Sequence, residues 1–274
     1  MIDLHLHTTA SDGLLSPVRL IAGAAAAGLT IVSVTDHDTV AGLGEARAAA
    51  DRLGLQLVDG IEVTAVVDSR DVHILGYFID PDSATLADFL GDQRVDRIRR
   101  VREIGERLDS LGLTVDVEGL LEGTRGSSRS VGRPAVADAL VAAGHAADRD
   151  DAFARLLGRG CPAFVPRRGV GGNQVIEQIH AAGGIASIAH PGILDRDSII
   201  PDLVAAGLDA VEVWHSDHTP EHQAHYDALA TRYGLARSGG SDYHGEGVHR
   251  ACQLGAVTLP AEHFAILSAR AGRQ

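Results

Sequence analysis

Residues 31–38 read Ile-Val-Ser-Val-Thr-Asp-His-Asp, a β-branched apolar run that ends abruptly in titratable side chains. Such a run predicts a buried strand whose last residues reach a polar edge. The neighbouring segments alternate between apolar runs and helical patterns that begin and end at Ser, Pro and Gly. The sequence predicts strands over 2–6, 31–35 and 55–58, helices over 17–27 and 40–53, and a hairpin over 62–67 and 72–78. This rhythm predicts a largely parallel sheet with helices outside it.

The middle of the chain has a different character, with almost no strand signal over 83–160. Helical spacing of apolar residues predicts helices over 86–111, 117–122, 134–143 and 150–157. The strand–helix alternation then returns, with helices over 173–182, 199–206, 220–233 and 261–271 and strands over 185–189, 210–214, 235–238 and 255–259. About seven strand–helix units around a helical insertion predict an α/β fold, a closed or distorted β/α barrel. We expect residues 1–82 and 163–274 to form the barrel and residues 83–162 to form an insertion that covers its active site.

The composition limits the possible functions of the 274-residue chain. A formal net charge of −13 argues against a broad basic surface for long nucleic acid, although a local phosphate pocket remains possible. All 24 basic residues are Arg, so Schiff-base and carbamylated-lysine chemistry is excluded. The 14 His outnumber the 10 aromatic residues, an excess that packing alone does not explain.

Cysteine and hydropathy patterns predict the compartment. Cys161 and Cys252 are too few for a disulfide framework and are expected to be buried free thiols. The first residues lack a signal-peptide pattern, and no apolar stretch is long enough for a membrane helix. We therefore expect a cytoplasmic protein with no membrane partner.

His and carboxylate side chains gather where the predicted strands end, the edge at which β/α barrels build active sites. His5 and His7 face the same way because side chains alternate along a strand. The same spacing relates Asp242 and His244 in a glycine-rich turn. The other strand ends carry Asp36-His37-Asp38, Glu62, His190 and Glu212 with His215, and Asp12 follows the first strand in Ser-Asp-Gly.

Taken singly, several of these residues have ordinary structural interpretations. Asp12 suits a turn, Asp38 suits the N-cap of the helix that follows it, and His73 suits the core of an apolar strand. Their joint placement favours metal binding. Nitrogen and oxygen ligands without thiolate indicate Zn²⁺, Mn²⁺ or Fe²⁺. More than four candidate ligands favour a multinuclear hydrolytic site.

These motifs resemble those of the PHP family, named for polymerase and histidinol phosphatase. The resemblance runs from residue 2 to about residue 258 and rests on one set of motifs: His5-Leu6-His7 with Asp12, Thr35-Asp36-His37-Asp38, Gly60-Ile61-Glu62, His73, Ala189-His190-Pro191 and Ser241-Asp242-Tyr243-His244. It implies a distorted seven-stranded, TIM-like (β/α)7 barrel with three divalent metal ions (Mn, Zn, Fe or Mg) at its C-terminal face.

The resemblance also implies a ligand set for each ion. His5, His7, Glu62 and Asp242 would hold the first ion; Asp12, His37 and His244 the second; His73, His190 and a bridging Glu62 the third. Gly132-Arg133-Pro134 and the run 161–167 resemble stand-alone PHP phosphoesterases, which act on nucleotides or short oligonucleotides. Ala135 stands where related proteins often carry His, which weakens the transfer of substrate identity.

The expected activity is hydrolysis of a nucleotide phosphoester, such as a 3′,5′-bisphosphonucleotide, by a metal-bound hydroxide. A mononucleotide, a short RNA 5′ end and a sugar phosphate are the other candidate substrates. We expect Arg133 to bind phosphate through its guanidinium, with a surface salt bridge as its alternative. His215 is a candidate phosphate contact or leaving-group acid, with a partly exposed structural role as its alternative. Arg167 is a candidate pocket residue.

Two other functions remain open. An amidohydrolase also begins with His-x-His on a barrel, but many members use a carbamylated Lys, and this chain has no Lys. A non-catalytic metal-binding regulatory module is the second alternative, which the full ligand set disfavours.

Overall fold

A seven-stranded sheet forms the centre of the protein, and its strands follow one another in sequence order, β1 to β7. The computed structural model describes residues 1–124, 127–246 and 253–272. The strands are β1 (Ile2–Leu6), β2 (Ile31–Val34), β3 (Gln56–Val67), β4 (Arg70–Tyr77), β5 (Ile185–Ile188), β6 (Ala210–Trp214) and β7 (Ala236–Gly239). All neighbours pair in parallel except β4, which is antiparallel to both β3 and β5.

The sheet curls so that its two ends approach each other, which confirms the expected nearly closed barrel. Just beyond β7, Tyr243 bridges to Leu6 of β1, and its carbonyl accepts a hydrogen bond from His7 N at 3.0 Å. The buried Asp3 carboxylate accepts from the backbone of His5 at 3.2 Å and of Ser241 at 2.9 Å. Gly240 makes this closure possible, because a Cβ there would lie 2.4 Å from His5 N.

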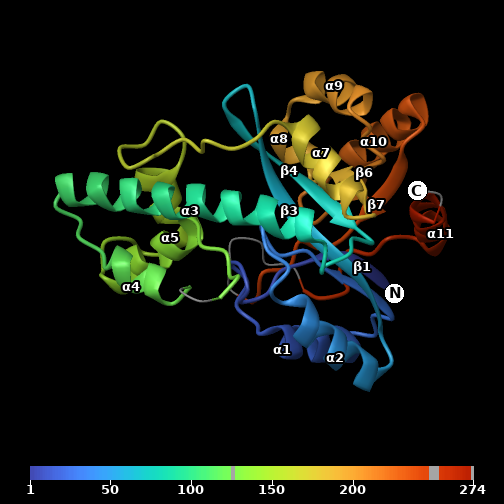
Figure 1. The fold of residues 1–274 in the computed structure, drawn as a ribbon, viewed down its shortest axis with the longest axis horizontal. Coiled ribbons are helices and arrows are strands. Elements are labelled where there is room, and N and C mark those ends of the chain that lie inside the picture. The colour runs from blue at the N-terminus through green and yellow to red at the C-terminus, as the bar shows by residue number, and fades with distance from the viewer. Residues whose placement is uncertain (125–126, 247–252, 273–274) are drawn as a thin grey trace.

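Helices cover the outside of the barrel (Figure 1). The helices α1 (Pro17–Ala26) and α2 (Leu43–Leu53) lie together on one side. Opposite them lie α7 (Gly172–Ala181), α8 (Pro191–Leu194), α9 (Ile200–Ala205) and α10 (Pro220–Tyr233), while α11 (Ala261–Ala271) lies beside the C-terminus. The apolar faces of the strands and of these helices share buried clusters, so the barrel is a packed core.

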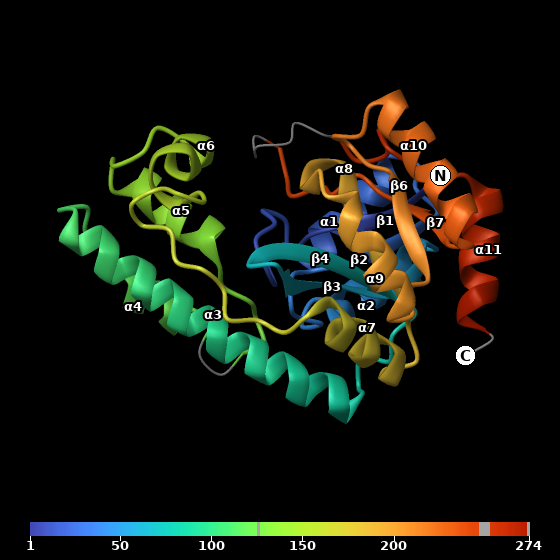
Figure 2. The same cartoon turned by 90° about the horizontal axis from the view of Figure 1, so that it is seen from above.

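A group of helices projects from one side of the barrel (Figure 2). It contains α3 (Ala84–Ser110), α4 (Val117–Glu122), α5 (Arg133–Ala142), α6 (Arg149–Ala152) and a π-helical turn, η1 (Phe153–Leu157). These helices have an apolar cluster of their own, which includes Ile104, Leu108, Leu140 and Leu157. The long α3 runs from this cluster back to the barrel, where Leu86 and Leu90 join the barrel core.

Several predicted elements are wrong in detail. The strand over 55–58 and the first strand of the hairpin are one continuous strand, β3, which pairs in parallel with β2 and then antiparallel with β4. The described residues 255–259 do not form the predicted strand. Leu259 N donates one hydrogen bond to Ile2 O at 2.9 Å, but no further strand pairing is formed there. The helix expected from residue 40 begins at Leu43.

One of the two cysteines lies within the described residues. Cys161 is a free cysteine but is only partly buried, with its Sγ 3.2 Å from the carbonyl oxygen of Ala154, so its expected burial was wrong. Cys252 lies outside the described residues. Within the described ranges, no helix is long and apolar enough to cross a membrane.

Candidate metal centre

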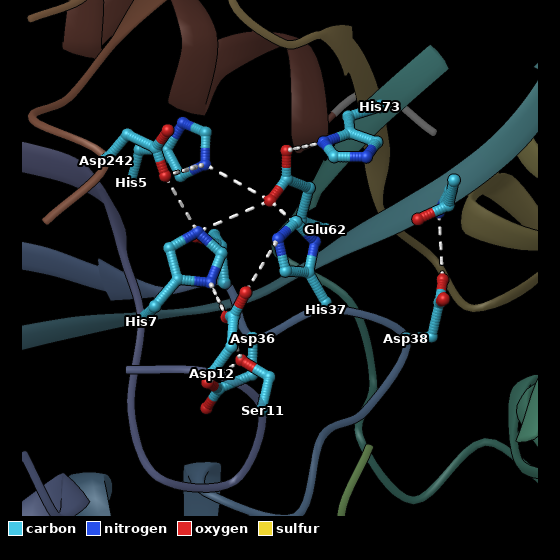
Figure 3. Close-up of polar contacts among 12 residues, drawn as sticks. His5, His7, Ser11, Asp12, Asp36, His37, Asp38, Glu62, His73 and Asp242 are labelled. Atoms are coloured by element: carbon cyan, nitrogen blue, oxygen red, sulfur yellow. Dashed lines mark hydrogen bonds and ion pairs between the residues drawn. The ribbon is translucent and has the colours of Figure 1, made fainter. Parts of the chain in front are cut away.

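Glu62 is at the centre of a cluster of imidazoles at one end of the barrel (Figure 3). Its carboxylate is buried and meets five His side chains. Oε2 lies 3.4 Å from His5 Nε2, 3.3 Å from His7 Nε2 and 3.0 Å from His37 Nδ1, and Oε1 lies 2.9 Å from His73 Nδ1 and 3.1 Å from His190 Nε2. One carboxylate therefore joins five ligand candidates from four segments of the chain.

Two aspartates complete the cluster. Asp242 Oδ1 lies 3.3 Å from His5 Nε2 and 3.0 Å from His7 Nε2. Asp12 lies on the other side of His7, with Oδ1 3.3 Å from His244 Nε2 and Oδ2 3.7 Å from His37 Nε2. The structure thus brings together all nine residues that the sequence proposed as metal ligands.

The convergent atoms form compact groups that match much of the expected ligand sets. Atoms of His5, His7, Glu62 and Asp242 lie within 4.8 Å of one another, as do those of His7, Asp12, His37 and His244, and those of His37, Glu62 and His73. His190 is close to the third group, since its ring centroid lies 5.2 Å from that of His73.

The direction of β4 explains why His73 joins this cluster. His73 is near the start of β4, whereas Glu62 lies within β3 and the other ligand candidates lie close to or after the ends of strands. Because β4 runs antiparallel to β3 and β5, its start lies at the edge where its neighbours carry the site. The carbonyl of His73 accepts a hydrogen bond from Ala189 N at 3.0 Å, next to His190.

The donor set fits divalent cations. Six buried atoms of the cluster have no hydrogen-bond partner among the described residues: His5 Nε2, both ring nitrogens of His7, His37 Nδ1, Glu62 Oε2 and His73 Nδ1. Buried polar atoms are rarely left unpaired, because each costs about 1–3 kcal/mol. Lone pairs of neutral imidazole and carboxylate that point at one another are explained if cations lie between them.

Burial and charge set the protonation of these groups. Burial lowers the pKa of His37 to about 4 and that of His190 to about 3, in spite of the nearby Glu62 carboxylate. These imidazoles are neutral at physiological pH, as metal ligation requires. Burial opposes the charged form of His5 too, but Glu212 and Glu62 raise its pKa to about 10, which shows how strongly this part of the site attracts positive charge.

A second layer of contacts orients the ligand candidates. The buried Glu212 Oε1 lies 2.9 Å from His5 Nδ1, and Oε2 accepts from His190 N at 2.7 Å. His244 Nδ1 lies 2.9 Å from the Asp242 carbonyl, so Nε2 faces Asp12. The sequence placed Glu212 at a strand end without a role.

Asp36 holds the loop that carries Asp12. Its carboxylate accepts hydrogen bonds from Ser11 Oγ at 2.6 Å and from Thr8 N at 2.7 Å.

The backbone is strained at the site. His190 has φ 29° and Asp242 has φ 54°, values that non-glycine residues rarely adopt. Such conformations cost about 1–3 kcal/mol and persist where the surroundings impose them, commonly at functional sites.

Asp38 has a different role from the one expected. The helix it was expected to cap begins five residues later, at Leu43, with Gly42 as its N-cap residue. Instead, the buried Asp38 carboxylate accepts from Arg97 Nε at 2.6 Å, Arg167 Nη1 at 2.9 Å and Thr64 N at 2.8 Å. Asp38 lies apart from the Glu62 cluster in Figure 3 and joins the barrel to α3.

Two cavities adjoin at His73 and His190, which line both. The first, which we name cavity 1, has a volume of about 580 Å³ and contains Asp12, His37, Asp242 and His244 in its wall. The projecting helices contribute Pro134, Arg149, Asp150, Phe153 and Ala154. The second, cavity 2, has a volume of about 520 Å³ and includes Arg133.

The three candidate substrate residues differ in position. Arg133 lines cavity 2, where its Nη2 lies 3.3 Å from Asp71 Oδ2. The Arg167 side chain is only 2% exposed, is paired with Asp38 and lies outside the walls of both cavities. His215 is likewise buried, with Nε2 3.3 Å from Asp242 Oδ2, and lies behind that carboxylate instead of in a cavity wall.

Comparisons with known proteins identify a family and several relatives of this chain. The PHP domain family matches residues 3–117. The chain is 36% identical to a 5′-3′ exoribonuclease of Haemophilus influenzae, over 88% of this chain and 89% of that protein. It is 35% identical to a 3′,5′-nucleoside bisphosphate phosphatase of Chromobacterium violaceum, over 90% of this chain and 88% of that protein. It is 36% identical to a phosphoribosyl 1,2-cyclic phosphate 1,2-diphosphodiesterase of Eggerthella lenta, over 89% of this chain and 94% of that protein.

Two solved structures share the whole fold. A metal-dependent phosphoesterase from Bifidobacterium adolescentis superposes with a TM-score of 0.89 at 34% identity, covering 98% of this chain and 96% of that one. A Chromobacterium violaceum protein described as an amidohydrolase with bound sulfate and no metal superposes with a TM-score of 0.87 at 34% identity. The match covers 98% of this chain and 96% of that one.

Proposed function

The chain belongs to the PHP family of metal-dependent phosphoesterases, and from that premise we propose that it hydrolyses a phosphoester of a nucleotide or short oligonucleotide at a trinuclear metal centre. A 3′,5′-bisphosphonucleotide or a short RNA 5′ end is the substrate we favour, since relatives over most of the chain are named for such substrates. The observation that carries the proposal is the convergence of buried imidazole and carboxylate atoms around Glu62, next to cavity 1, whose wall contains His37, His73 and Asp242.

Nine residues would hold the ions. His5, His7, Glu62 and Asp242 would hold the first; Asp12, His37 and His244 the second; Glu62, His73 and His190 the third. Mn²⁺, Zn²⁺, Fe²⁺ and Mg²⁺ are candidates, because the donors are nitrogen and oxygen without thiolate.

Divalent ions at such a centre neutralise phosphoryl oxygens and lower the pKa of a bound water to about 7. Three of them would outweigh the charge of Asp12, Glu62 and Asp242 and make the pocket attractive to phosphate within an acidic protein.

The chain's own residues position the substrate. We assign phosphate binding to Arg133, whose guanidinium lines cavity 2 and suits phosphate geometry. Arg149 is fixed at the wall of cavity 1 by Asp138, with Nε and Nη2 both 2.6 Å from its carboxylate oxygens. His215 is a positioning residue for Asp242. Residues 83–162 then serve as the insertion that covers the site on a barrel formed by 1–82 and 163–274.

A phosphate-release screen tests the proposal. The purified protein, loaded in turn with Mn²⁺, Zn²⁺, Fe²⁺ or Mg²⁺, is offered adenosine 3′,5′-bisphosphate, AMP, a 5′-phosphorylated dinucleotide and a panel of amides and lactones. We expect phosphate release from at least one nucleotide and none of the amides to react. His37→Ala and Asp242→Ala should lose activity and bound metal, whereas Arg168→Gln, at an exposed arginine, should lose neither.

Other outcomes separate the alternatives. Hydrolysis of amides or lactones alone would establish an amidohydrolase. Bound metal without any turnover would indicate a regulatory module. Activity in both alanine variants equal to that of the wild type would refute the assigned site.

A further inference from the structure

His190 differs from the other eight ligand candidates in how its side chain is held. Among the described residues, convergent donor atoms form compact groups that include those eight, and His190 belongs to none of these groups. Its Nε2 lies 3.1 Å from Glu62 Oε1, and its side chain lines both cavities. The conformation of the backbone at His190 therefore decides where this ring lies.

The turn that carries His190 is short and strained. His190 lies between β5 and α8, which begins at Pro191, and its φ of 29° is rare for a non-glycine residue. His190 N donates to Glu212 Oε2 at 2.7 Å, and Gly192 N donates to His218 Nε2 at 3.1 Å. Strained backbone persists only where its surroundings impose it, and these two contacts come from β6 and from the turn that follows it.

The His218 ring is fixed in one tautomer. Its Nδ1 lies 2.9 Å from the carbonyl oxygen of Val213, which can only accept, so Nδ1 carries the proton. Nε2 then has a lone pair, as the hydrogen bond from Gly192 N requires. Burial lowers the pKa of His218, which keeps the ring neutral and Nε2 able to accept. One imidazole thus connects the backbone of β6 with the backbone of the His190 turn.

Packing restricts the position of the His218 ring. The ring stacks on Tyr226 of α10, with the two centroids 5.3 Å apart and an angle of 28° between the planes. A Cβ at Gly192 would lie 2.8 Å from His218 Cδ2 and 3.1 Å from His222 Nδ1. Glycine is therefore needed at this position for the turn to approach the ring closely enough to form its hydrogen bond.

We propose that His218 is a positioning residue for the third ion, because it holds the turn that presents His190. This inference rests on the proposed function, since it needs an ion held by Glu62, His73 and His190. His218 lies outside the walls of both cavities, so it acts through the backbone of Gly192 and makes no contact with the substrate. Contacts outside the ligand shell orient the ligands, and losing one weakens metal binding by about 10- to 100-fold.

Two variants separate the hydrogen bond of His218 from its packing. His218→Gln retains an oxygen that can accept from Gly192 N but removes the ring from Tyr226. His218→Phe retains an aromatic ring against Tyr226 but has no acceptor. The control is His225→Gln, also on α10, whose side chain is 54% exposed and pairs with Asp197. Each purified protein is loaded with Mn²⁺ and dialysed, its metal content is measured, and Mn²⁺ is titrated into the metal-depleted form in a calorimeter.

We expect the wild type and His225→Gln to retain three ions per chain and His218→Phe to retain two. The affinity for the most weakly bound ion should fall about 10- to 100-fold in His218→Phe and much less in His218→Gln, while the other two affinities stay unchanged. Gly192→Ala should behave as His218→Phe does, because the added methyl group would displace the turn from the ring.

Three tightly bound ions in His218→Phe would overturn the inference. Loss of an ion in His218→Gln but not in His218→Phe would overturn it too, because packing would then be the cause, and so would an equal loss of all three affinities. If His218→Phe does not fold, unchanged affinities in Gly192→Ala are the contradicting result. A wild type that binds fewer than three ions refutes the trinuclear centre of the proposed function, a result read from the wild type alone and distinct from the others.

Discussion

Glu212 Oε1 lies 2.9 Å from Nδ1 of His5, and both side chains are completely buried. The contact leaves Nε2 of His5 facing Glu62 and Asp242. Because the other oxygen of Glu212 accepts from the backbone of His190, one carboxylate fixes ligand candidates on two strand ends. Carboxylates that hold the outer nitrogen of a ligating His set its tautomer and its orientation.

We therefore expect Glu212→Gln to weaken metal binding by about 10- to 100-fold while leaving the fold in place. Metal content after dialysis and a metal titration followed by calorimetry measure this effect. Glu262→Gln, at an exposed position of α11, is the control. Unaltered metal affinity in Glu212→Gln would show that the contact with His5 does not orient a ligand.

Removing metal ions should destabilise the protein as well as abolish its activity. Buried carboxylates and unpaired imidazoles face one another around Glu62, and cations that bind only the folded state stabilise it. We expect chelation to lower Tm in a scanning calorimeter and added Mn²⁺ or Zn²⁺ to restore it. In Glu62→Gln, which removes the shared charge, chelation should shift Tm much less; an equal shift in both proteins would contradict the assigned centre.

The contact of Asp38 with Arg97 and Arg167 predicts a large stability effect. Asp38→Asn leaves two buried guanidinium groups without their carboxylate, and breaking a buried pair in this way costs about 3–5 kcal/mol. Urea unfolding at pH 7 measures the change. Glu118→Gln, in an exposed pair with Arg102, should leave the free energy of unfolding nearly unchanged.

The same contact has a defined pH dependence. Burial alone would raise the pKa of Asp38, but Arg97 and Arg167 hold it well below the ordinary value. A carboxyl with a lowered folded pKa adds stability above its unfolded value of about 4 and loses it as the pH falls further. The difference in unfolding free energy between wild type and Asp38→Asn should therefore shrink from pH 7 to pH 3. A difference that stays constant over this range would contradict the assigned pairing.

Local patterns were sufficient to predict much of the site. The spacing of two residues fixes the common face of His5 and His7, and polar groups directly after apolar strands have to meet at one edge of a barrel. The antiparallel direction of β4 was implied by the hairpin expected over 62–67 and 72–78, although its consequence for His73 followed only from the structure.

Contacts between distant segments explain what the sequence did not predict. Asp38 was predicted to cap a helix from its local sequence. Its partner Arg97 lies 59 residues away on α3, so no local pattern could show their contact. The sequence predicted one strand over 55–58 and another over 62–67, with a break between them, but both belong to β3. A Cβ at Gly60 would lie 2.2 Å from Ser33 Oγ, so glycine is needed for β3 to pass close to β2. His215 was expected either at the substrate or in a partly exposed structural role, and the sequence did not show that its ring is buried against Asp242.

Phe153 offers a test of nucleobase recognition. It begins the π-helical turn η1, a type of irregularity often found at functional sites, and it lines cavity 1. The guanidinium carbon of Arg133 lies 5.5 Å from its ring centroid, which fixes the ring between the two cavities. Stacking of a base on an aromatic side chain contributes about 1–3 kcal/mol.

We expect Phe153→Ala to lower kcat/KM for adenosine 3′,5′-bisphosphate about tenfold relative to ribose 3,5-bisphosphate, which has no base to stack. Phe153→Tyr should retain the preference, because it keeps the ring, and this variant controls for loss of packing in η1. If Phe153→Ala slows both substrates equally, the ring serves to position Arg133 and the helical wall of cavity 1 instead of recognising the base.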